Sequence, residues 1–145
     1  TNSGRYKAQL SGPVTGNVLL RRAQHLALSD SKRTLNLARQ FVASKLQNSR
    51  IQLLRSSRDA GSQRDHELLA TAAAELGLSL ERLPDTDDLN QVRGTEGEAA
   101  RIYFEAFSAM VRARRDTFAF RGRSRRPPQD PINAVISFLY SLFLI

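Results

Sequence analysis

One carboxylate, Glu96, stands where helical spacing places it on the apolar side of a helix. It lies in the stretch RGTEGEAARIYFEAF, residues 93–107, and shares a helix face with Tyr103 and Phe107. A buried charge is costly unless it is paired or binds a metal. Because hard divalent cations such as Mg²⁺ or Mn²⁺ take carboxylate oxygens, Glu96 is a candidate metal ligand for a reaction on a phosphate substrate.

A structural interpretation of Glu96 competes with the metal hypothesis. Thr95 and Glu98 match a capping box, with Thr95 as the N-cap of a helix and Glu98 at the third position. Glu96 then lies in the first turn, where the helix dipole favours a negative charge. The two interpretations differ in what the Glu96 carboxylate contacts, and the sequence leaves both open.

The most basic part of the chain follows this helix. Residues 112–126 hold seven arginines against one acid, Asp116, a net charge of +6, with Phe118 and Phe120 interleaved. Arginines with aromatic residues on a loop suit a DNA backbone or an unpaired strand. The alternative is a solvated loop whose phenylalanines belong to the core. The predicted nucleic-acid-binding residues are Arg112, Arg115, Arg121, Arg123, Arg125 and Arg126, together with Lys45 on an earlier helix.

Composition favours a nucleic-acid partner and excludes several classes of site. The 145 residues carry a net charge of +8, and only three of the 22 basic residues are lysine. A GC-rich genome explains the arginine usage equally well, but not the excess of basic over acidic residues. The absence of cysteine excludes disulfides and thiolate metal sites, and makes the cytoplasm the expected compartment. The longest apolar stretch, INAVISFLYSLFLI, is shorter than the roughly 20 residues of a membrane helix, so no membrane partner is expected.

The elements that position these residues are expected to be mainly α-helices. Strand-like residues occur at 5–10 and 17–21, and helical spacing follows. Gly77 is expected to end one helix, and Asp130 to cap the last, with Pro131 at its first position. The predicted helices cover residues 31–58, 64–76, 86–93, 95–115 and 131–145, and the loop 117–131 is predicted to begin with an extended piece at 117–120.

Both ends of the sequence indicate a piece of a longer protein. The last residues, YSLFLI, lack the glycine or asparagine that usually ends a helix. The strand-like residues near the start have no partner strand, and an isolated hairpin is marginally stable. We therefore expect the protein to continue at both ends.

These features together resemble one family. The stretches GTEGEAARIYFEAF and FAFRGRSRRPPQDPINAVISFLYSLF are similar to CRISPR-associated protein one, the integrase and endonuclease of spacer acquisition. The early segments GRYKAQLSGPVTGNVLLRRAQ and LARQFVASKLQNSRIQLLR resemble its type I-C branch. The resemblance covers nearly the whole chain. It implies a metal-dependent enzyme that inserts DNA fragments into the repeat array by transesterification.

The resemblance also implies a fold and a set of site residues. The family has an N-terminal β-domain followed by an α-helical catalytic domain. Residues 1–22 would be the last strand and linker of the first domain, and residues 23–145 the N-terminal part of the second. The glutamate of the family's Glu-Gly pair binds Mg²⁺ or Mn²⁺, and here it is Glu96. The near-site candidates are Tyr103, Asp130 and Asn133.

The same resemblance also implies the partners of the protein and a metal site that this sequence does not complete. It implies DNA as substrate, a homodimer, and CRISPR-associated protein two as a further partner. The family completes its metal site with a histidine and an aspartate downstream of the proline-rich helix, and this sequence ends at Ile145, before either. The fragment is therefore expected to lack the cation and to be inactive. A non-enzymatic helical DNA-binding module is the second hypothesis, and a helical protein that binds an acidic partner is the third.

Overall fold

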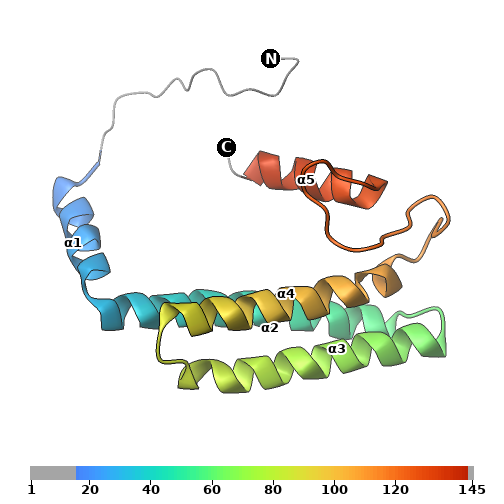
Figure 1. Ribbon diagram of the computed structural model, residues 1–145, viewed down its shortest axis with the longest axis horizontal. Helices are drawn as coiled ribbons and strands as arrows, with labels where there is room; N and C mark the ends of the chain where they lie inside the picture. The colour runs from blue at the N-terminus through green and yellow to red at the C-terminus, as the bar shows by residue number, and fades with distance from the viewer. Residues whose placement is uncertain (1–15, 144–145) are drawn as a thin grey trace, which may run out of the picture. The chain divides into compact units, whose positions relative to one another are not determined.

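The computed structural model describes residues 16–143. Within that range it contains α-helices and one short 3₁₀ turn, and no strand (Figure 1). The predicted mainly-α class is confirmed for these residues. They divide into two compact units, with the boundary between Thr34 and Leu35. The elements are α1 (Val18–Ser29), α2 (Ser31–Arg58), α3 (Gln63–Arg82), a 3₁₀ turn η1 (Leu83–Asp85), α4 (Leu89–Met110) and α5 (Pro131–Phe143).

The first unit contains α1, which replaces a predicted strand. The side-chain oxygen of Asn17 accepts hydrogen bonds from the backbone N–H groups of Leu19 and Leu20, at 3.0 and 3.2 Å. An N-cap followed by leucines, arginines and alanines favours a helix, so the strand predicted at residues 17–21 is wrong. The strand predicted at residues 5–10 lies outside the described residues.

In the second unit, α2, α3 and α4 run side by side around one hydrophobic core (Figure 1). Leucines fill its centre, and Leu53, Leu69 and Leu76 are fully buried. Both α3 and α4 bury alanines, which lets their backbones approach closely. These alanines are Ala72 and Ala73 on α3, and Ala99, Ala106 and Ala109 on α4.

The third helix is longer than predicted, because Gly77 does not end it and α3 continues to Arg82. A Cβ atom at Gly77 would lie 3.3 Å from the Nε of Arg50, so the glycine makes room for an arginine side chain from α2. Beyond it, Leu80 packs against the core and Leu83 is buried. This continuing apolar face outweighs the cost of about 1 kcal/mol for a glycine inside a helix.

The fourth helix is continuous where the sequence predicted two helices, at residues 86–93 and 95–115. It begins after Asp88, whose carboxylate accepts hydrogen bonds from the backbone N–H groups of Asn90 and Gln91 at 2.7 and 2.9 Å. Its buried face then extends through the whole helix. The true N-cap therefore lies seven residues before the predicted one.

The predicted capping box at Thr95 and Glu98 is wrong for the same reason. Thr95 lies inside α4, where its hydroxyl donates a hydrogen bond to the backbone carbonyl of Gln91 at 3.0 Å. The helix ends at Met110, before the predicted end. Neither Thr95 nor Glu98 therefore has a capping role.

Replacing Asp88 by alanine should lower the free energy of unfolding by about 1 kcal/mol, because the N-cap loses two hydrogen bonds to the backbone. Thr95→Ala should change that free energy by less than about 0.5 kcal/mol, since alanine is the better helix former. Urea unfolding followed by circular dichroism measures both values. A larger loss for Thr95→Ala than for Asp88→Ala would contradict the observed helix start.

The loop after α4 begins with a turn rather than the predicted extended piece at residues 117–120. The backbone N–H groups of Thr117 and Phe118 both donate to the carbonyl of Arg114, at 3.0 and 2.8 Å. Phe120 then turns inward and packs against Phe107 of α4, with ring centroids 4.9 Å apart. The predicted burial of the loop phenylalanines is thus confirmed for Phe120, which anchors the loop to α4, and wrong for Phe118, which is exposed.

The last helix, α5, starts at Pro131 as predicted, because the Asp130 carboxylate accepts a hydrogen bond from the backbone N–H of Asn133 at 2.7 Å. Asn133 is the buried residue of this helix, and apolar side chains such as Phe138 and Phe143 are exposed. Within residues 16–143, no helix has both the length and the hydrophobicity of a transmembrane span.

Candidate functional site

The Glu96 carboxylate is paired with a cation from another helix. It lies 2.5 Å from the Nζ of Lys45 on α2, and the two side chains are 39% and 53% exposed. Glu96 is therefore at the edge of the core and not inside it. The first-turn interpretation of Glu96 is wrong, since α4 begins at Asp88, and the ion pair answers how the charge on this helix face is compensated.

A cavity of about 550 Å³ opens beside this ion pair. The predicted residues Glu96, Lys45, Tyr103 and Arg125 all line it, so the structure brings four of the predicted site residues together. Tyr140 from α5 completes the wall. Burial, with a smaller contribution from Tyr140, raises the pKa of the Tyr103 hydroxyl above its ordinary value, so this hydroxyl is a proton-bearing donor at neutral pH.

The described residues do not fit a complete site for a divalent cation. Among them, no three His, Cys, Asp or Glu side chains gather closely enough to hold a metal. Glu96 offers one carboxylate, and Lys45 already contacts it. A cation at Glu96 therefore needs further ligands from outside residues 16–143.

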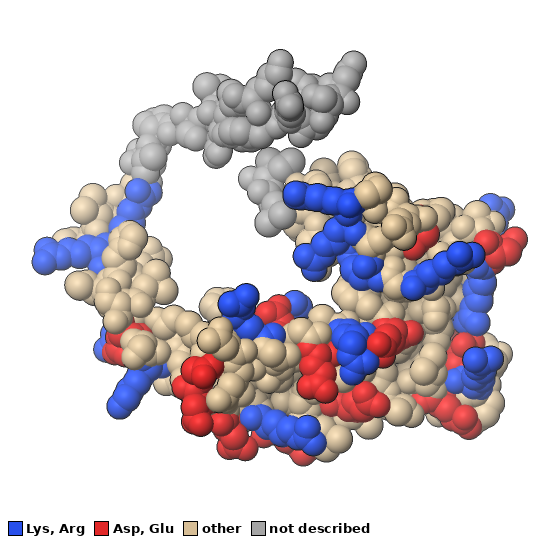
Figure 2. All heavy atoms as spheres, in the orientation of Figure 1, with Lys and Arg blue, Asp and Glu red and all other residues tan. Residues whose placement is uncertain are grey.

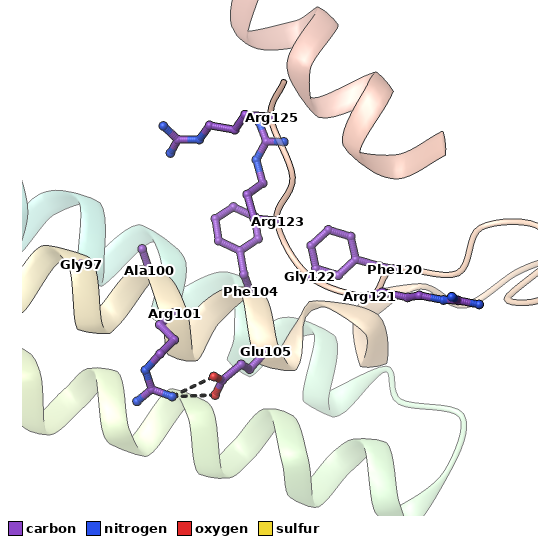
Figure 3. Close-up of a pocket in the computed structure, with 10 residues that line it drawn as sticks. All are labelled: Gly97, Ala100, Arg101, Phe104, Glu105, Phe120, Arg121, Gly122, Arg123 and Arg125. Carbon is purple, nitrogen blue, oxygen red and sulfur yellow. Dashed lines mark hydrogen bonds and ion pairs between the residues drawn. The ribbon is translucent and has the colours of Figure 1, made fainter. Parts of the chain in front are cut away.

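A second cavity, of about 730 Å³, lies between α4 and the arginine-rich loop (Figure 3). Figure 3 shows the rings of Phe104 and Phe120 between the helix and the loop, with Arg125 on the opposite side of the rings from the ion pair of Arg101 and Glu105. That pair is 2.8 Å apart. Because Arg125 lines this cavity and the Glu96 cavity, the two are neighbours.

Three of the seven residues predicted to bind nucleic acid are paired with other side chains of the protein. Lys45 pairs with Glu96, Arg115 lies 2.8 Å from the Asp65 carboxylate on α3, and Arg123 bonds to Asn133. The other four are exposed, and none forms a hydrogen bond or ion pair with another described residue. These four are Arg112, Arg121, Arg125 and Arg126.

The contact between Asp65 and Arg115 should make stability depend on acid pH. The hydrogen bond from Arg115, followed by one from Ser62, lowers the pKa of the Asp65 carboxyl below its ordinary value of 3.8. A lowered pKa in the folded state stabilises the fold above the unfolded pKa, and this contribution is lost as the pH falls through the folded pKa.

Arg115→Ala should therefore be less stable than the unmodified chain at pH 7, with a difference that shrinks as the pH falls below about 3.8. Unfolding in urea at pH 7, 4 and 2.5 measures the difference. The matched control is Arg112→Ala, since Arg112 is exposed and has no partner among the described residues. A constant difference across the three pH values would contradict the role of Asp65.

The other near-site candidates, Asp130 and Asn133, lie together at the start of α5, outside the cavity of Glu96. The Asn133 side-chain oxygen accepts from the backbone N–H of Ser124 at 3.0 Å and from the Nη1 of Arg123 at 2.8 Å. Its amide nitrogen donates to the carbonyl of Gly122 at 2.8 Å and to Asp130 at 2.6 Å. We call these five residues the clasp.

Acidic and basic residues are distributed unevenly along the second unit. Residues 59–110 contain 11 acidic and 4 basic residues, a net charge of −7. Residues 111–143 contain 7 arginines and 2 acidic residues, a net charge of +5. Figure 2 shows basic side chains gathered around the loop and α5, and most acidic side chains lower in the view, where α3 and α4 lie. Residues 35–58 add five basic residues and no acid, so the acidic charge of the unit lies in the segment that holds α3 and α4, and the loop and α2 are basic.

The family model described as CRISPR associated protein Cas1 matches residues 1–144. This chain belongs to the Cas1 family. It is 49% identical over 141 residues to CRISPR-associated endonuclease Cas1 1 of Moorella thermoacetica, covering 97% of this chain and 41% of that protein. It is 44% identical over 142 residues to CRISPR-associated endonuclease Cas1 1 of Chlorobaculum tepidum, covering 98% and 41%.

A third Cas1 relative, CRISPR-associated endonuclease Cas1 2 of Rhodospirillum rubrum, is 42% identical over 147 residues, covering 96% of this chain and 41% of that protein. The chain thus spans about two fifths of the length of these relatives. The predicted family membership is confirmed, while assignment to the type I-C branch stays a prediction.

Proposed function

We propose that the protein containing this chain is a metal-dependent DNA endonuclease and integrase of CRISPR spacer acquisition. The observation that carries the proposal is one cavity lined by Glu96, Tyr103 and Arg125, next to a loop of exposed arginines. A carboxylate, a phenol and a guanidinium at one cavity suit a phosphodiester substrate. The printed names of the relatives, CRISPR-associated endonucleases, support the same reaction class.

The reaction that we propose is a transesterification. The 3′-hydroxyl oxygen of a DNA fragment forms a bond to phosphorus at the repeat boundary, and the bond from phosphorus to the leaving 3′-oxygen breaks. Mg²⁺ or Mn²⁺, when bound, supplies positive charge next to the phosphate oxygens. Glu96 would be one of its ligands, with the others outside the described residues.

The chain's own residues would orient the substrate. Lys45 fixes the Glu96 carboxylate on the α2 side of the cavity. The Tyr103 hydroxyl is protonated at neutral pH, and it can donate a hydrogen bond to a phosphate oxygen. Exposed arginines such as Arg121 and Arg125 would hold the DNA backbone. DNA, a homodimer and CRISPR-associated protein two are the proposed partners, and the cytoplasm is the proposed compartment.

The domain assignment is proposed on the same basis. Residues 1–22 would join an N-terminal β-domain to a helical catalytic domain that begins at residue 23. The 145-residue chain alone would then be inactive, because residues 16–143 bring no group of ligands together at Glu96, where a catalytic site needs several.

A chimera tests the proposed function. The matching 141 residues of the Moorella thermoacetica relative are replaced by those of this chain, and cleavage of branched DNA is measured in Mn²⁺ and in EDTA. We expect cleavage by the chimera in Mn²⁺ only, and none by the 145-residue chain. A chimera that unfolds cooperatively and still fails to cleave would contradict the proposal, and so would Mn²⁺-dependent cleavage by the chain alone.

A non-enzymatic helical DNA-binding module is the alternative function. The ion pair of Glu96 with Lys45 favours it, because this contact occupies the carboxylate without any metal. In the chimera, which supplies the further metal ligands, the two functions differ in the effect of Glu96→Gln on DNA affinity in Mg²⁺. A binding module should keep its affinity, whereas a metal-assisted substrate site should lose affinity. Fluorescence anisotropy with a labelled duplex distinguishes them.

A further inference from the structure

We propose that Asn133 is a positioning residue for DNA binding, which acts by holding the arginine-rich loop in one conformation against α5. This inference rests on the proposed DNA-binding function, and it assigns Asn133 a role through the loop and not through contact with the substrate. Three features of the clasp lead to it: the saturation of the Asn133 amide, the backbone of Gly122 and the placement of Arg123.

The amide of Asn133 has no capacity left for a ligand. A side-chain amide donates two hydrogen bonds and accepts two, and all four are used here. Asn133 is also fully buried, with 0% of its surface exposed. A substrate therefore cannot reach this side chain, and its contacts are all with the loop and the helix start.

The loop side of the clasp depends on a backbone that favours glycine. Gly122 has a φ angle of 127°, a region that residues with a side chain rarely adopt. This conformation accompanies the hydrogen bond from the amide of Asn133 to the Gly122 carbonyl. On the other side, Asp130 accepts hydrogen bonds from both the backbone and the side chain of Asn133. The residues that start α5 are thus the ones that hold the loop.

At the clasp, one arginine side chain points into the fold, and the arginines two positions before and after it are exposed. The Nη1 of Arg123 bonds to Asn133 and to the hydroxyl of Ser137, and its guanidinium lies 5.8 Å from the centre of the Tyr140 ring. Arg121 and Arg125 stand two residues before and after Arg123, and both are exposed. Figure 3 shows these two side chains extending in opposite directions from the loop.

Arg123 therefore holds the loop against α5. Arg121 and Arg125 are the side chains that the loop exposes to solvent. Fixing a backbone residue costs conformational entropy. A loop that the clasp has already ordered does not bear this cost when DNA binds, so the affinity of its exposed arginines is higher. Loss of Asn133 should release the loop and weaken DNA binding, although no DNA contact is removed.

Two substitutions test the clasp. Asn133→Ala removes all four side-chain hydrogen bonds. Asn133→Asp keeps the size of the side chain, but it loses the donor to Gly122 and faces the carboxylate of Asp130. Ser57→Ala is the matched control, because it removes a buried polar group that bonds to His66 at the α2–α3 connection, far along the chain from the loop.

The first measurement needs no DNA. Trypsin cleaves after Arg121 and Arg123, and mass spectrometry follows the cleavage rate at a temperature where circular dichroism shows every variant folded. We expect cleavage at least about ten times faster in both Asn133 variants, and an unchanged rate in Ser57→Ala. Equal rates in the Asn133 variants and the unmodified chain would overturn the inference.

The second measurement is a double-mutant cycle with a labelled DNA duplex in EDTA. Asn133→Ala should weaken binding about tenfold in the unmodified background. It should have almost no effect in the Arg121→Ala/Arg125→Ala background, where the loop presents no arginines at these two positions. Equal weakening in both backgrounds would show a general structural effect and would overturn the inference.

The two measurements separate the inference from the proposed function. If the unmodified chain binds no DNA, the DNA-binding role proposed for its loop fails, and trypsin cleavage alone decides whether the clasp holds the loop. If trypsin cleavage accelerates while DNA affinity is unchanged, the clasp exists but does not position the arginines, and the inference is overturned with the proposed function intact.

Discussion

Replacing Glu96 by glutamine in the chimera should lower the rate of Mn²⁺-dependent DNA cleavage by about 100-fold or more. Glutamine keeps the length of the side chain but removes the negative charge that a hard cation requires. It also ends the ion pair with Lys45, so both candidate roles of the carboxylate are lost at once. Initial cleavage rates on branched DNA, at saturating Mn²⁺, measure the effect.

Glu98→Gln is the matched control for this experiment. Glu98 lies on the same helix and is exposed, and it lines neither the cavity of Glu96 nor the cavity shown in Figure 3. Its substitution should change the cleavage rate by less than about twofold. Unimpaired cleavage by the Glu96→Gln chimera would exclude Glu96 as a metal ligand and leave it as the structural partner of Lys45.

Removing four exposed arginines of the loop, which have no hydrogen-bond or ion-pair partner among the described residues, should give the second large effect. The variant carries alanine at positions 112, 121, 125 and 126, all of which are exposed in the structure. DNA affinity at low salt should fall by about 100-fold to 1000-fold, and the salt dependence should become shallower by about one for each phosphate contact that is lost. Anisotropy titrations from low to physiological salt give both quantities.

The control for charge alone places four arginine-to-alanine substitutions elsewhere on the second unit. The exposed residues Arg55, Arg58, Arg64 and Arg82 lie on α2 and α3, and their loss changes the net charge by the same amount. This control should weaken binding by less than about threefold, because all four arginines lie outside the loop and two of them are on the acidic helix α3. Equal losses in the two variants would show that affinity follows net charge and that the loop is no interface.

Local signals in the sequence were sufficient for much of the fold. Apolar spacing predicted the bounds of α2, and the Asp-Pro pair predicted both the start and the cap of α5. The failures arose where packing outweighs a local signal. Gly77 marks a helix end in isolation, but in the fold it accommodates Arg50 from another helix. Similarly, Thr95 resembles a cap until Asp88 and the continuous core face start the helix earlier.

The candidate site shows the same division between local and long-range information. Glu96 and the arginine-rich loop could be found from residue types and spacing. The partner of Glu96, Lys45, is 51 residues away, and the partner of Arg115, Asp65, is 50 residues away. Such pairs depend on how helices are aligned against one another, which no short-range pattern contains. Sequence reasoning therefore treated Lys45 and Arg115 as free cations, although both are engaged.

The division of charge between α3 and α4 on one side and the loop on the other also bears on how the chain would meet a polyanion in solution. A molecule that diffuses toward DNA with its acidic α3 and α4 helices leading is repelled, while one that turns the loop forward is attracted. Electrostatic forces therefore favour the orientation in which the loop faces the DNA before any contact forms. The association rate should accordingly fall steeply as salt is added, and the lifetime of the complex, set by close contacts, should change less.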